Sequence, residues 1–432
     1  MDFESISEYL LDFNKRKLPD LIKRDLKIPD TKKIKTIIGP RRAGKTYFMF
    51  QKIKEMINSE IKKEEIIYLN FEDPRLIDLN FKEIKEIIKI QRRLFPKINK
   101  INLFIDEPQN IKNWEVAIRS LHDECYNIFL SGSNSKLLSK EIATSLRGRT
   151  ITYLLLPFSF KEFLKIDNLN LDIKKLNSKE KAILMSYYDK YLEFGGFPEI
   201  IFEKDEENKL RIILEYFNMV VYKDIVERYK IKNNELIRWM IKSLINSFSK
   251  EFSVNKVYLT LKSQGIKLSK NTLYSYSSML QDSMFVFFLD KFKKSIRKKE
   301  LSISKAYLND VVFSKIGESS KNLGRKMENI VFLELQQRKN PLSEISYWKN
   351  EQKQEVDFVI KETKVKQLIQ ICYDLKDLDT KKREIRALIN AGKELKCKNL
   401  LIITHNKDGE EYYKNFKIKF IPLWKWLLKC RT

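Results

Sequence analysis

The feature that most constrains this chain is a glycine-rich loop between an apolar run and a helical pattern. Residues 34–38 form the apolar run, and residues 47–53 have helical spacing. The loop has the spacing G-x-x-x-x-G-K-T and is composed of Gly39-Pro40-Arg41-Arg42-Ala43-Gly44-Lys45-Thr46. In a strand–loop–helix unit of this kind, backbone N–H groups surround the phosphates of a nucleoside triphosphate. A chance match would leave only a glycine turn and an exposed lysine, but the flanking strand and helix favour nucleotide binding.

The end of this loop carries the groups that contact the nucleotide. Lys45 is predicted to reach the β- and γ-phosphates, and the Thr46 hydroxyl to ligate Mg²⁺. The helix that opens at Tyr47 adds partial positive charge beneath the phosphates. We therefore predict that residues 39–47 bind the cofactor.

Strand and helix patterns alternate after the loop. The predicted strands are 65–71, 101–105 and 126–130, and the predicted helices are 81–93 and 114–124. This alternation predicts an α/β fold with a parallel sheet covered on both faces. Ligands of such sheets bind at the carboxyl ends of the strands.

Two carboxylates, Asp106 and Glu107, follow the second of these strands. Phosphoryl transfer requires a metal ion that neutralises charge and an acceptor that orients the attacking water. Asp106 is predicted to hold Mg²⁺ and Glu107 to polarise the water. The alternative is that these two acids are simply solvated at the end of a strand. The phosphate loop upstream favours the catalytic role.

Further polar residues follow the third strand. Asn134 or Ser133 would lie beside the γ-phosphate and report its presence; helix capping is the alternative role. Arg149, with Arg147 as second choice, is predicted to stabilise transition-state charge on this chain's nucleotide or on a neighbour's. In a basic protein these arginines could also be ordinary surface residues.

Taken in order, these motifs resemble one family of AAA+ ATPases. The motifs are the phosphate loop, Leu69-Asn70-Phe71-Glu72-Asp73, Phe104-Ile105-Asp106-Glu107, Ser131-Gly132-Ser133, Leu146-Arg147-Gly148-Arg149 and residues 157–163. Members occur in archaea and bacteria and join an AAA+ core to a C-terminal region of unknown function, and the resemblance covers most of the chain. It implies ATP and Mg²⁺ as cofactors. It also implies a sheet in which the sensor strand lies between the phosphate-loop strand and the strand that ends in Asp106.

Pattern changes along the chain predict four domains. They are an AAA+ P-loop ATPase core (1–165), a helical lid (166–247), a winged helix-turn-helix (248–300) and a C-terminal α/β nuclease-like domain (301–432). Residues 178–247 have helical spacing almost throughout, with a sharp turn at 194–198.

The winged helix-turn-helix is predicted from an amphipathic helix, a turn, a second helix opening at Ser269 and a β-rich run at 284–289. The second helix would enter a DNA major groove. The residues placed to touch DNA are Lys270, Asn271, Tyr274 and Ser275, and the basic run 291–299 would follow phosphates. Many winged helices serve only as protein-binding or interdomain modules, which is the alternative.

The C-terminal αβββαβ pattern looks like the PD-(D/E)XK nuclease fold. That chemistry needs two acidic metal ligands and a lysine. Asp357 and Glu328 fit the acids, whereas the E-x-K position contains Gln370-Ile371-Cys372, and Cys372 cannot replace a lysine cation. Lys366 lies about 20 Å away along the same strand, at ~3.3 Å per residue. We therefore predict a domain that does not cleave and that serves binding or oligomerisation.

The charge of the chain favours a polyanionic partner. Lysine and arginine total 84 and aspartate and glutamate 58, a formal net charge of +26. Cations that displace counterions from phosphates drive nucleic-acid binding. A lysine-rich codon bias is the alternative explanation, although it also raises glutamate. DNA is the expected partner, and a protein partner and a homo-oligomer remain open.

Composition also predicts the compartment. No apolar run reaches ~18 residues, so no membrane helix is expected. The first residues are acidic and mixed, unlike a signal peptide. Scattered cysteines and two histidines argue for a reducing cytoplasm and against zinc. The cysteines are Cys125, Cys372, Cys397 and Cys430.

These observations predict an ATP-binding and ATP-hydrolysing AAA+ protein that couples its nucleotide state to DNA binding or remodelling. Two alternatives remain: an ATP-gated switch that docks a protein partner, and an ATP-regulated nuclease using Glu328, Asp357 and Gln370.

Overall fold

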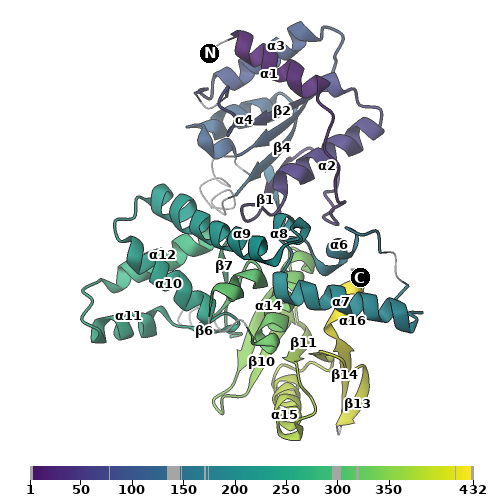
Figure 1. Ribbon diagram of the computed structural model, residues 1–432, viewed down its shortest axis with the longest axis vertical. Coiled ribbons are helices and arrows are strands. Elements are labelled where there is room, and N and C mark those ends of the chain that lie inside the picture. Colours follow the sequence, from purple (N-terminus) through teal and green to yellow (C-terminus); the bar gives the residue numbers. More distant parts are fainter. Residues whose placement is uncertain are drawn as a thin grey trace. The chain divides into compact units, whose positions relative to one another are not determined.

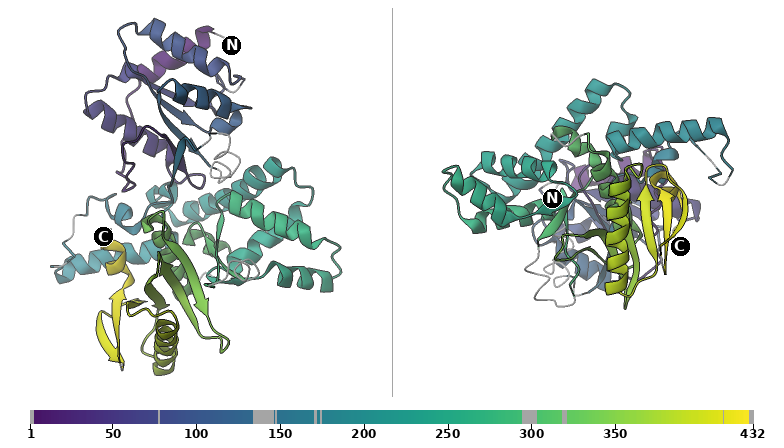
Figure 2. Two further views of the ribbon diagram at one scale, coloured as in Figure 1. Left: turned by 180° about the vertical axis from the view of Figure 1, so that it is seen from behind. Right: turned by 90° about the horizontal axis from the view of Figure 1, so that it is seen from below.

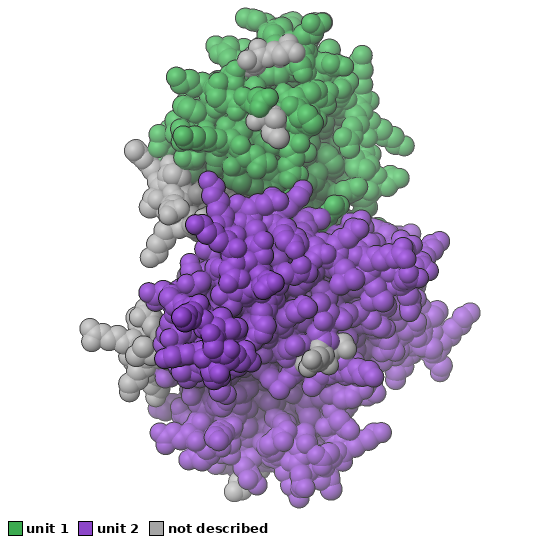
Figure 3. Space-filling view, turned by 60° about the vertical axis from the view of Figure 1, so that its left-hand side comes forward, with its two compact units in different colours: residues 1–156 green, residues 157–432 purple. Residues whose placement is uncertain are grey.

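The computed structural model describes residues 3–76, 78–133, 146, 148–169, 172–173, 175–293, 303–317, 321–413 and 415–429. The chain divides into two compact units, residues 1–156 and 157–432 (Figure 3). The predicted boundary at residue 165 is therefore displaced. Helix α6 (Phe160–Leu164) buries Phe160 and Phe163 in a core of the second unit, which assigns this segment to that unit.

The first unit is a parallel sheet with helices on its faces (Figure 1). Its strands are β1 (Ile34–Ile38), β2 (Ile66–Asn70), β3 (Asn102–Asp106), β4 (Asn127–Gly132) and β5 (Thr150–Leu154). Its α-helices are α1 (Phe3–Lys15), α2 (Lys45–Asn58), α3 (Glu83–Leu94) and α4 (Trp114–Asp123), with 3₁₀ turns η1 (Lys63–Glu65) and η2 (Pro108–Asn110).

The strand order in this sheet is β2-β3-β4-β1-β5, and every pairing is parallel. All five residues of β1 and of β3 are buried, as expected for parallel strands covered on both faces. The predicted α/β fold class is confirmed. So is the predicted position of the sensor strand, because β4 lies between β1 and β3.

The second unit begins with helices. They are α6, α7 (Ser178–Phe194), α8 (Pro198–Phe202), α9 (Glu206–Met219), the π-helix η4 (Val220–Glu227) and α10 (Asn234–Asn246). Asn177 and Glu180 form a capping box at the start of α7, and Gly195, with φ +67°, ends that helix. The predicted sharp turn therefore lies where the sequence placed it; its role as part of a lid stays a prediction.

A buried carboxylate holds this turn. Asp310 accepts hydrogen bonds from the backbone N–H groups of Gly196 at 2.8 Å and Val312 at 2.9 Å. A side chain at Gly195 would lie 1.6 Å from Asp310 Oδ1, so only glycine fits there. Burial raises the pKa of Asp310 to about 7, although both N–H donors oppose the shift.

We expect the free energy of unfolding to fall as the pH rises from about 4 to about 7. Over this range the folded chain keeps the Asp310 proton, whereas the unfolded chain, in which its pKa is 3.8, has lost it. The folded state thus binds more protons, and raising the pH favours unfolding by up to about 4 kcal/mol. Urea denaturation across this range checks the effect. Asp310→Asn should flatten the pH profile, and a profile parallel to the wild type would contradict the assignment.

A small antiparallel sheet follows. Its strands are β6 (Lys250–Phe252), β7 (Val286–Leu289) and β8 (Ser304–Leu308), in the order β6-β8-β7, with helices α11 (Val254–Ser263) and α12 (Lys270–Asp282) between β6 and β7. The predicted boundary at residue 300 is wrong in one respect, because it separates β8 from the two strands that it pairs with. The winged-helix assignment itself stays a prediction.

The C-terminal part is a six-stranded mixed sheet in the order β13-β14-β12-β11-β10-β9. Its strands are β9 (Glu344–Lys349), β10 (Glu355–Lys361), β11 (Val365–Cys372), β12 (Leu400–Thr404), β13 (Gly409–Tyr413) and β14 (Phe416–Pro422). The accompanying helices are the 3₁₀ helix η5 (Val311–Ile316), α14 (Leu323–Arg338), α15 (Leu378–Glu394) and α16 (Leu423–Leu428).

Alternation along these strands builds two cores. Phe358 and Ile369 face the core shared with α14 and α16, whereas Val359 and Leu368 face the core shared with α15. Figure 2 shows α15 lying along the sheet in both views. The edge strand β13 was not predicted, because its residues are exposed or half-buried and carry no apolar run.

Candidate functional site

The glycine-rich loop joins the end of β1 to the start of α2. A side chain at Gly39 would lie 1.9 Å from the carbonyl oxygen of Leu155, so the loop requires glycine to pass that strand end. Gly44 has φ +92° and Arg42 has φ +63°, both in the left-handed region. These backbone angles turn the chain back toward the first turn of α2, as a loop that surrounds phosphates requires.

The Lys45 side chain lies over its own loop. Its ammonium is buried and donates to the carbonyl oxygens of Gly39 at 3.1 Å and Pro40 at 3.0 Å. The positive charge is therefore at the mouth of the loop, where the predicted phosphates would bind.

Asp106 is the last residue of β3 and lies beside the loop. Its Oδ2 accepts from Thr46 Oγ1 at 2.6 Å and from the Tyr68 hydroxyl at 3.2 Å, and its Oδ1 accepts from the Ser131 hydroxyl. Burial and the neighbouring charge of Glu107 raise the pKa of Asp106. The structure thus brings together two hard oxygen ligands, a carboxylate and a hydroxyl, which suit Mg²⁺. Thr46 and Asp106 would hold that ion, which neutralises phosphate charge when bound.

Glu107 follows directly, with φ +52°. Its Oε2 accepts from the backbone N–H and the hydroxyl of Ser133, each at 3.3 Å, and from the amide of Gln109. The predicted catalytic carboxylate therefore contacts one of the two sensor candidates. The other, Asn134, lies outside the described residues, so the choice between them stays open.

Arg149 lies where the strands of this sheet begin, at the end of the sheet opposite the phosphate loop. It precedes β5, and its carbonyl oxygen accepts from the N–H of Ile34 at the start of β1. Five residues of β5 separate it from the phosphate-loop edge, roughly 16 Å at 3.3 Å per residue. Its guanidinium pairs with Asp123 at 2.8 Å. Action on the nucleotide of its own chain does not fit this position, and action on a neighbour's nucleotide stays a prediction; Arg147 lies outside the described residues.

Comparison with known proteins connects this geometry to a family. Residues 31–164 match the family model described as an AAA domain. Residues 185–313 and 323–426 match two models described as domains of unknown function. An uncharacterized protein of Methanocaldococcus jannaschii is 43% identical over 94% of this chain and 91% of its own length. The chain belongs to the AAA+ ATPases.

Relatives of this AAA+ protein also occur in bacteria. An uncharacterized protein of Haemophilus influenzae is 30% identical over 72% of this chain and 76% of its own length. Among solved structures, the Aeropyrum pernix ORC2 protein has 13% identity and a TM-score of 0.34, over 78% of this chain and 94% of that one. The predicted AAA+ resemblance is confirmed for the ATPase part, and the nuclease-like part stays a prediction.

Arg24 is a residue of the AAA+ unit that the sequence did not reveal. It is buried and donates to the carbonyl oxygens of Ala43 at 2.9 Å and Leu156 at 2.6 Å. Its backbone N–H donates to the side chain of Gln51 in α2 at 2.7 Å. Arg24 thus connects the phosphate loop to the last residue of its unit. Nothing in the stretch around Arg24 signals this, because it lies in irregular chain without a motif.

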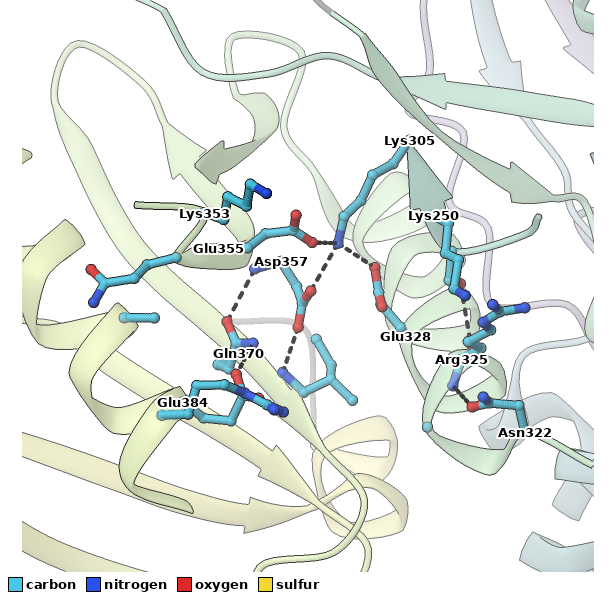
Figure 4. Close-up of a pocket in the computed structure, with 16 residues that line it drawn as sticks. Lys250, Lys305, Asn322, Arg325, Glu328, Lys353, Glu355, Asp357, Gln370 and Glu384 are labelled. Carbon is cyan, nitrogen blue, oxygen red and sulfur yellow. Dashed lines mark hydrogen bonds and ion pairs between the residues drawn. The ribbon is translucent and has the colours of Figure 1, made fainter. Parts of the chain in front are cut away.

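A second charged site lies in the other unit, in a cavity of about 440 Å³ (Figure 4). The ammonium of Lys305, on β8, lies at its centre and contacts Glu328 at 2.9 Å, Glu355 at 2.7 Å and Asp357 at 2.9 Å. The Tyr307 hydroxyl also donates to Glu328 at 2.7 Å. A lysine therefore stands beside the two predicted acids, Glu328 and Asp357, although none occurs at the expected position on β11.

These contacts shift the titration of the cluster. Burial and the charge of Asp357 raise the pKa of Glu328 to about 7. Burial also raises the pKa of Asp357, although the positive charge of Lys305 opposes the shift. For Lys305, burial alone would lower the pKa, but the charges of Asp357 and Glu328 raise it well above its ordinary value.

The remaining C-terminal candidates lie around this cluster or away from it. Gln370 accepts from the backbone N–H of Asp357 at 3.2 Å and donates to Glu384 at 2.7 Å. Cys372 is buried and burial raises the pKa of its thiol to about 12. Lys366 is exposed and pairs with Glu362 at 3.3 Å, away from the cluster as the strand spacing predicts. The only sequence signal for this cation is that Lys305 and Tyr307 alternate with apolar residues along β8. That pattern does not identify the acids that Lys305 contacts.

No helix among the described residues is long and apolar enough to cross a bilayer. Within the same part of the chain, no group of three or more histidine, cysteine, aspartate or glutamate side chains could hold a metal ion. The predicted Mg²⁺ position is unaffected, since it uses one carboxylate and one hydroxyl.

Proposed function

We propose that this protein hydrolyses ATP with Mg²⁺ and that its nucleotide state controls its binding to DNA. The hydrogen bond from Thr46 to Asp106 at the phosphate-loop edge of the sheet, with Glu107 directly after Asp106, carries the ATPase part of this proposal. Lys45 binds the phosphates, and Thr46 and Asp106 hold the metal ion. Glu107, oriented by Ser133, accepts a hydrogen bond from the attacking water.

The exposed face of α12 supports the DNA part. Leu273 and Tyr276 are buried against the helices around it, whereas Lys270, Asn271 and Tyr274 are exposed. Lys270 lies over the Tyr274 ring, 5.8 Å from its centre. A basic and aromatic face on the second of two helices, followed by an antiparallel hairpin, has the chemistry of a major-groove reader. The net charge of +26 agrees with a polyanionic partner.

We expect the double change Lys270→Ala and Tyr274→Ala to weaken duplex binding by about tenfold or more, because it removes a phosphate or base contact and an aromatic surface. Fluorescence anisotropy of a labelled duplex, with and without ATP, measures this. The matched control is Lys398→Ala, which removes one exposed charge elsewhere in the second unit. Duplex binding that is insensitive to salt, or ATP hydrolysis that does not respond to DNA, would favour a protein-docking switch instead.

We further propose that Arg149 acts on the nucleotide of a neighbouring copy. Its position opposite the phosphate loop supports this, because that edge is where a second subunit's loop could approach it. Arg149→Ala should abolish most ATP hydrolysis while ATP binding persists. Mixing it with a Lys45→Ala variant should restore part of the activity, because each copy supplies what the other lacks. A hydrolysis rate proportional to enzyme concentration, in a protein shown to be monomeric, would exclude action on a neighbour's nucleotide.

A further inference from the structure

Three hydroxyl groups from three different elements hold the carboxylate of Asp106. Its Oδ2 accepts from Thr46 Oγ1 at 2.6 Å and from the Tyr68 hydroxyl at 3.2 Å, and its Oδ1 accepts from the Ser131 hydroxyl. Thr46 lies in the first turn of α2, whereas Tyr68 and Ser131 lie on β2 and β4, the strands that flank β3. Thr46 belongs to the phosphate loop and Ser131 to the sensor strand, but Tyr68 belongs to neither.

Aromatic packing fixes the ring of Tyr68. The ring stacks on Phe13 of α1, with 5.5 Å between the centroids, and lies tilted against Phe50 of α2 at 5.0 Å. The side chain is buried, and a buried hydroxyl needs a hydrogen-bond partner. Asp106 is the partner that this hydroxyl has among the described residues. The packed ring therefore presents a donor at a fixed point beside the carboxylate.

Strand register explains why the contact uses a tyrosine. β2 and β3 run parallel, with Tyr68 opposite Phe104 and Asn70 opposite Asp106. The hydroxyl thus reaches Asp106 from two residues back along the sheet, roughly 7 Å at ~3.3 Å per residue. Serine and threonine are too short to span this separation, and phenylalanine has the length but no donor.

The three donors leave Asp106 room for one further partner. An ionised carboxylate has about four acceptor sites, and the hydroxyls of Thr46, Tyr68 and Ser131 occupy three of them. Because each donor comes from a different element, the carboxylate cannot turn without breaking at least one of these hydrogen bonds. A cation, or a water molecule bound to a cation, suits the remaining site.

We propose that Tyr68 is a positioning residue of the ATPase site, whose hydroxyl orients Asp106 and thereby sets the affinity of the site for Mg²⁺. Hydrogen-bond partners behind a metal ligand typically change metal affinity or activity by about 10- to 100-fold when they are removed. The inference rests on the proposed ATP hydrolysis with Mg²⁺ and adds a residue to it. The alternative is that the hydroxyl contacts Asp106 only to satisfy its own burial.

The test uses the full chain with a non-hydrolysable ATP analogue and Mn²⁺, which replaces Mg²⁺ and can be measured by electron paramagnetic resonance. Tyr68→Phe removes the hydroxyl and keeps the ring between Phe13 and Phe50. We expect its affinity for Mn²⁺ to fall by about tenfold, whereas its affinity for the analogue in EDTA stays unchanged. The matched control is Tyr153→Phe, on β5, three strands away from β3 in the same sheet, which should leave the Mn²⁺ affinity unchanged.

Two further measurements separate positioning from a purely structural role. In steady-state hydrolysis, the half-saturating Mg²⁺ concentration of Tyr68→Phe should rise by about tenfold, whereas kcat at saturating Mg²⁺ should stay within about threefold of the wild type. Placing 4-aminophenylalanine at Tyr68 returns a donor to the same ring position and should restore most of the Mn²⁺ affinity.

Equal Mn²⁺ affinities of Tyr68→Phe and the wild type would overturn this role for Tyr68. So would a loss confined to thermal stability or to kcat, or a loss that 4-aminophenylalanine does not restore. A wild-type protein that neither binds Mn²⁺ with the analogue nor hydrolyses ATP would instead contradict the proposed function itself.

Discussion

Glu107→Gln is expected to lower the rate of ATP hydrolysis by about two to three orders of magnitude while ATP affinity stays within a few fold. The substitution preserves the size of the side chain, and its amide can still contact Ser133 and Gln109, which hold Glu107 in place. The amide lacks the negative charge that orients and polarises the attacking water. The loss should therefore fall on the chemical step and not on binding.

Single-turnover hydrolysis and the affinity for a fluorescent ATP analogue separate these two effects. Glu86→Gln is the matched control, because it makes the same change on the exposed face of α3. It should leave both quantities unchanged. A Glu107→Gln protein that hydrolyses ATP within about fivefold of the wild type would show that another group orients the water.

Lys45→Ala is expected to weaken ATP binding by about a hundredfold or more, equivalent to about 2.7 kcal/mol. The change removes the ammonium that lies over the phosphate loop, and with it the donor to the carbonyl oxygens of Gly39 and Pro40. Both the positive charge for the phosphates and the local support of the loop are lost. Isothermal titration with ATP and Mg²⁺ measures the effect.

Lys52→Ala is the control for this change, because Lys52 lies further along the same helix and pairs with Glu55 at 2.7 Å. Its ATP affinity should match the wild type. Thermal unfolding with and without ATP provides a second measurement, since a ligand stabilises the state that it binds. An undiminished ATP-dependent rise in Tm for Lys45→Ala would contradict the role given to Lys45.

Local patterns predicted the fold of the first unit well. The loop's spacing encodes its own backbone geometry, because Gly39 and Gly44 occupy positions that a larger side chain would strain. Asp106 and Glu107 were found because the ends of parallel strands meet at one edge of a sheet. Contacts within that edge, such as Ser133 with Glu107, follow from strand order once β4 lies between β1 and β3.

Side chains that act across long separations escaped prediction. Arg24 reaches Leu156 from irregular chain, and no periodicity records such a contact. Arg149 was predicted to act on its own chain's nucleotide or on a neighbour's, because it follows the sensor strand in sequence. Only the parallel direction of β5 shows that it begins at the opposite edge of the sheet.

The amino-acid sequence by itself determined the AAA+ core, its phosphate loop and the acids at the end of β3, since each depends on neighbours close along the chain. The tertiary structure alone decided which cation lies beside the acids of the C-terminal cavity. A lysine was sought at Cys372, on the same strand as Gln370, but the cation comes from β8, 52 residues before Asp357. Strand alternation places Lys305 on a face but does not say which acids lie across from it, and packing decides that.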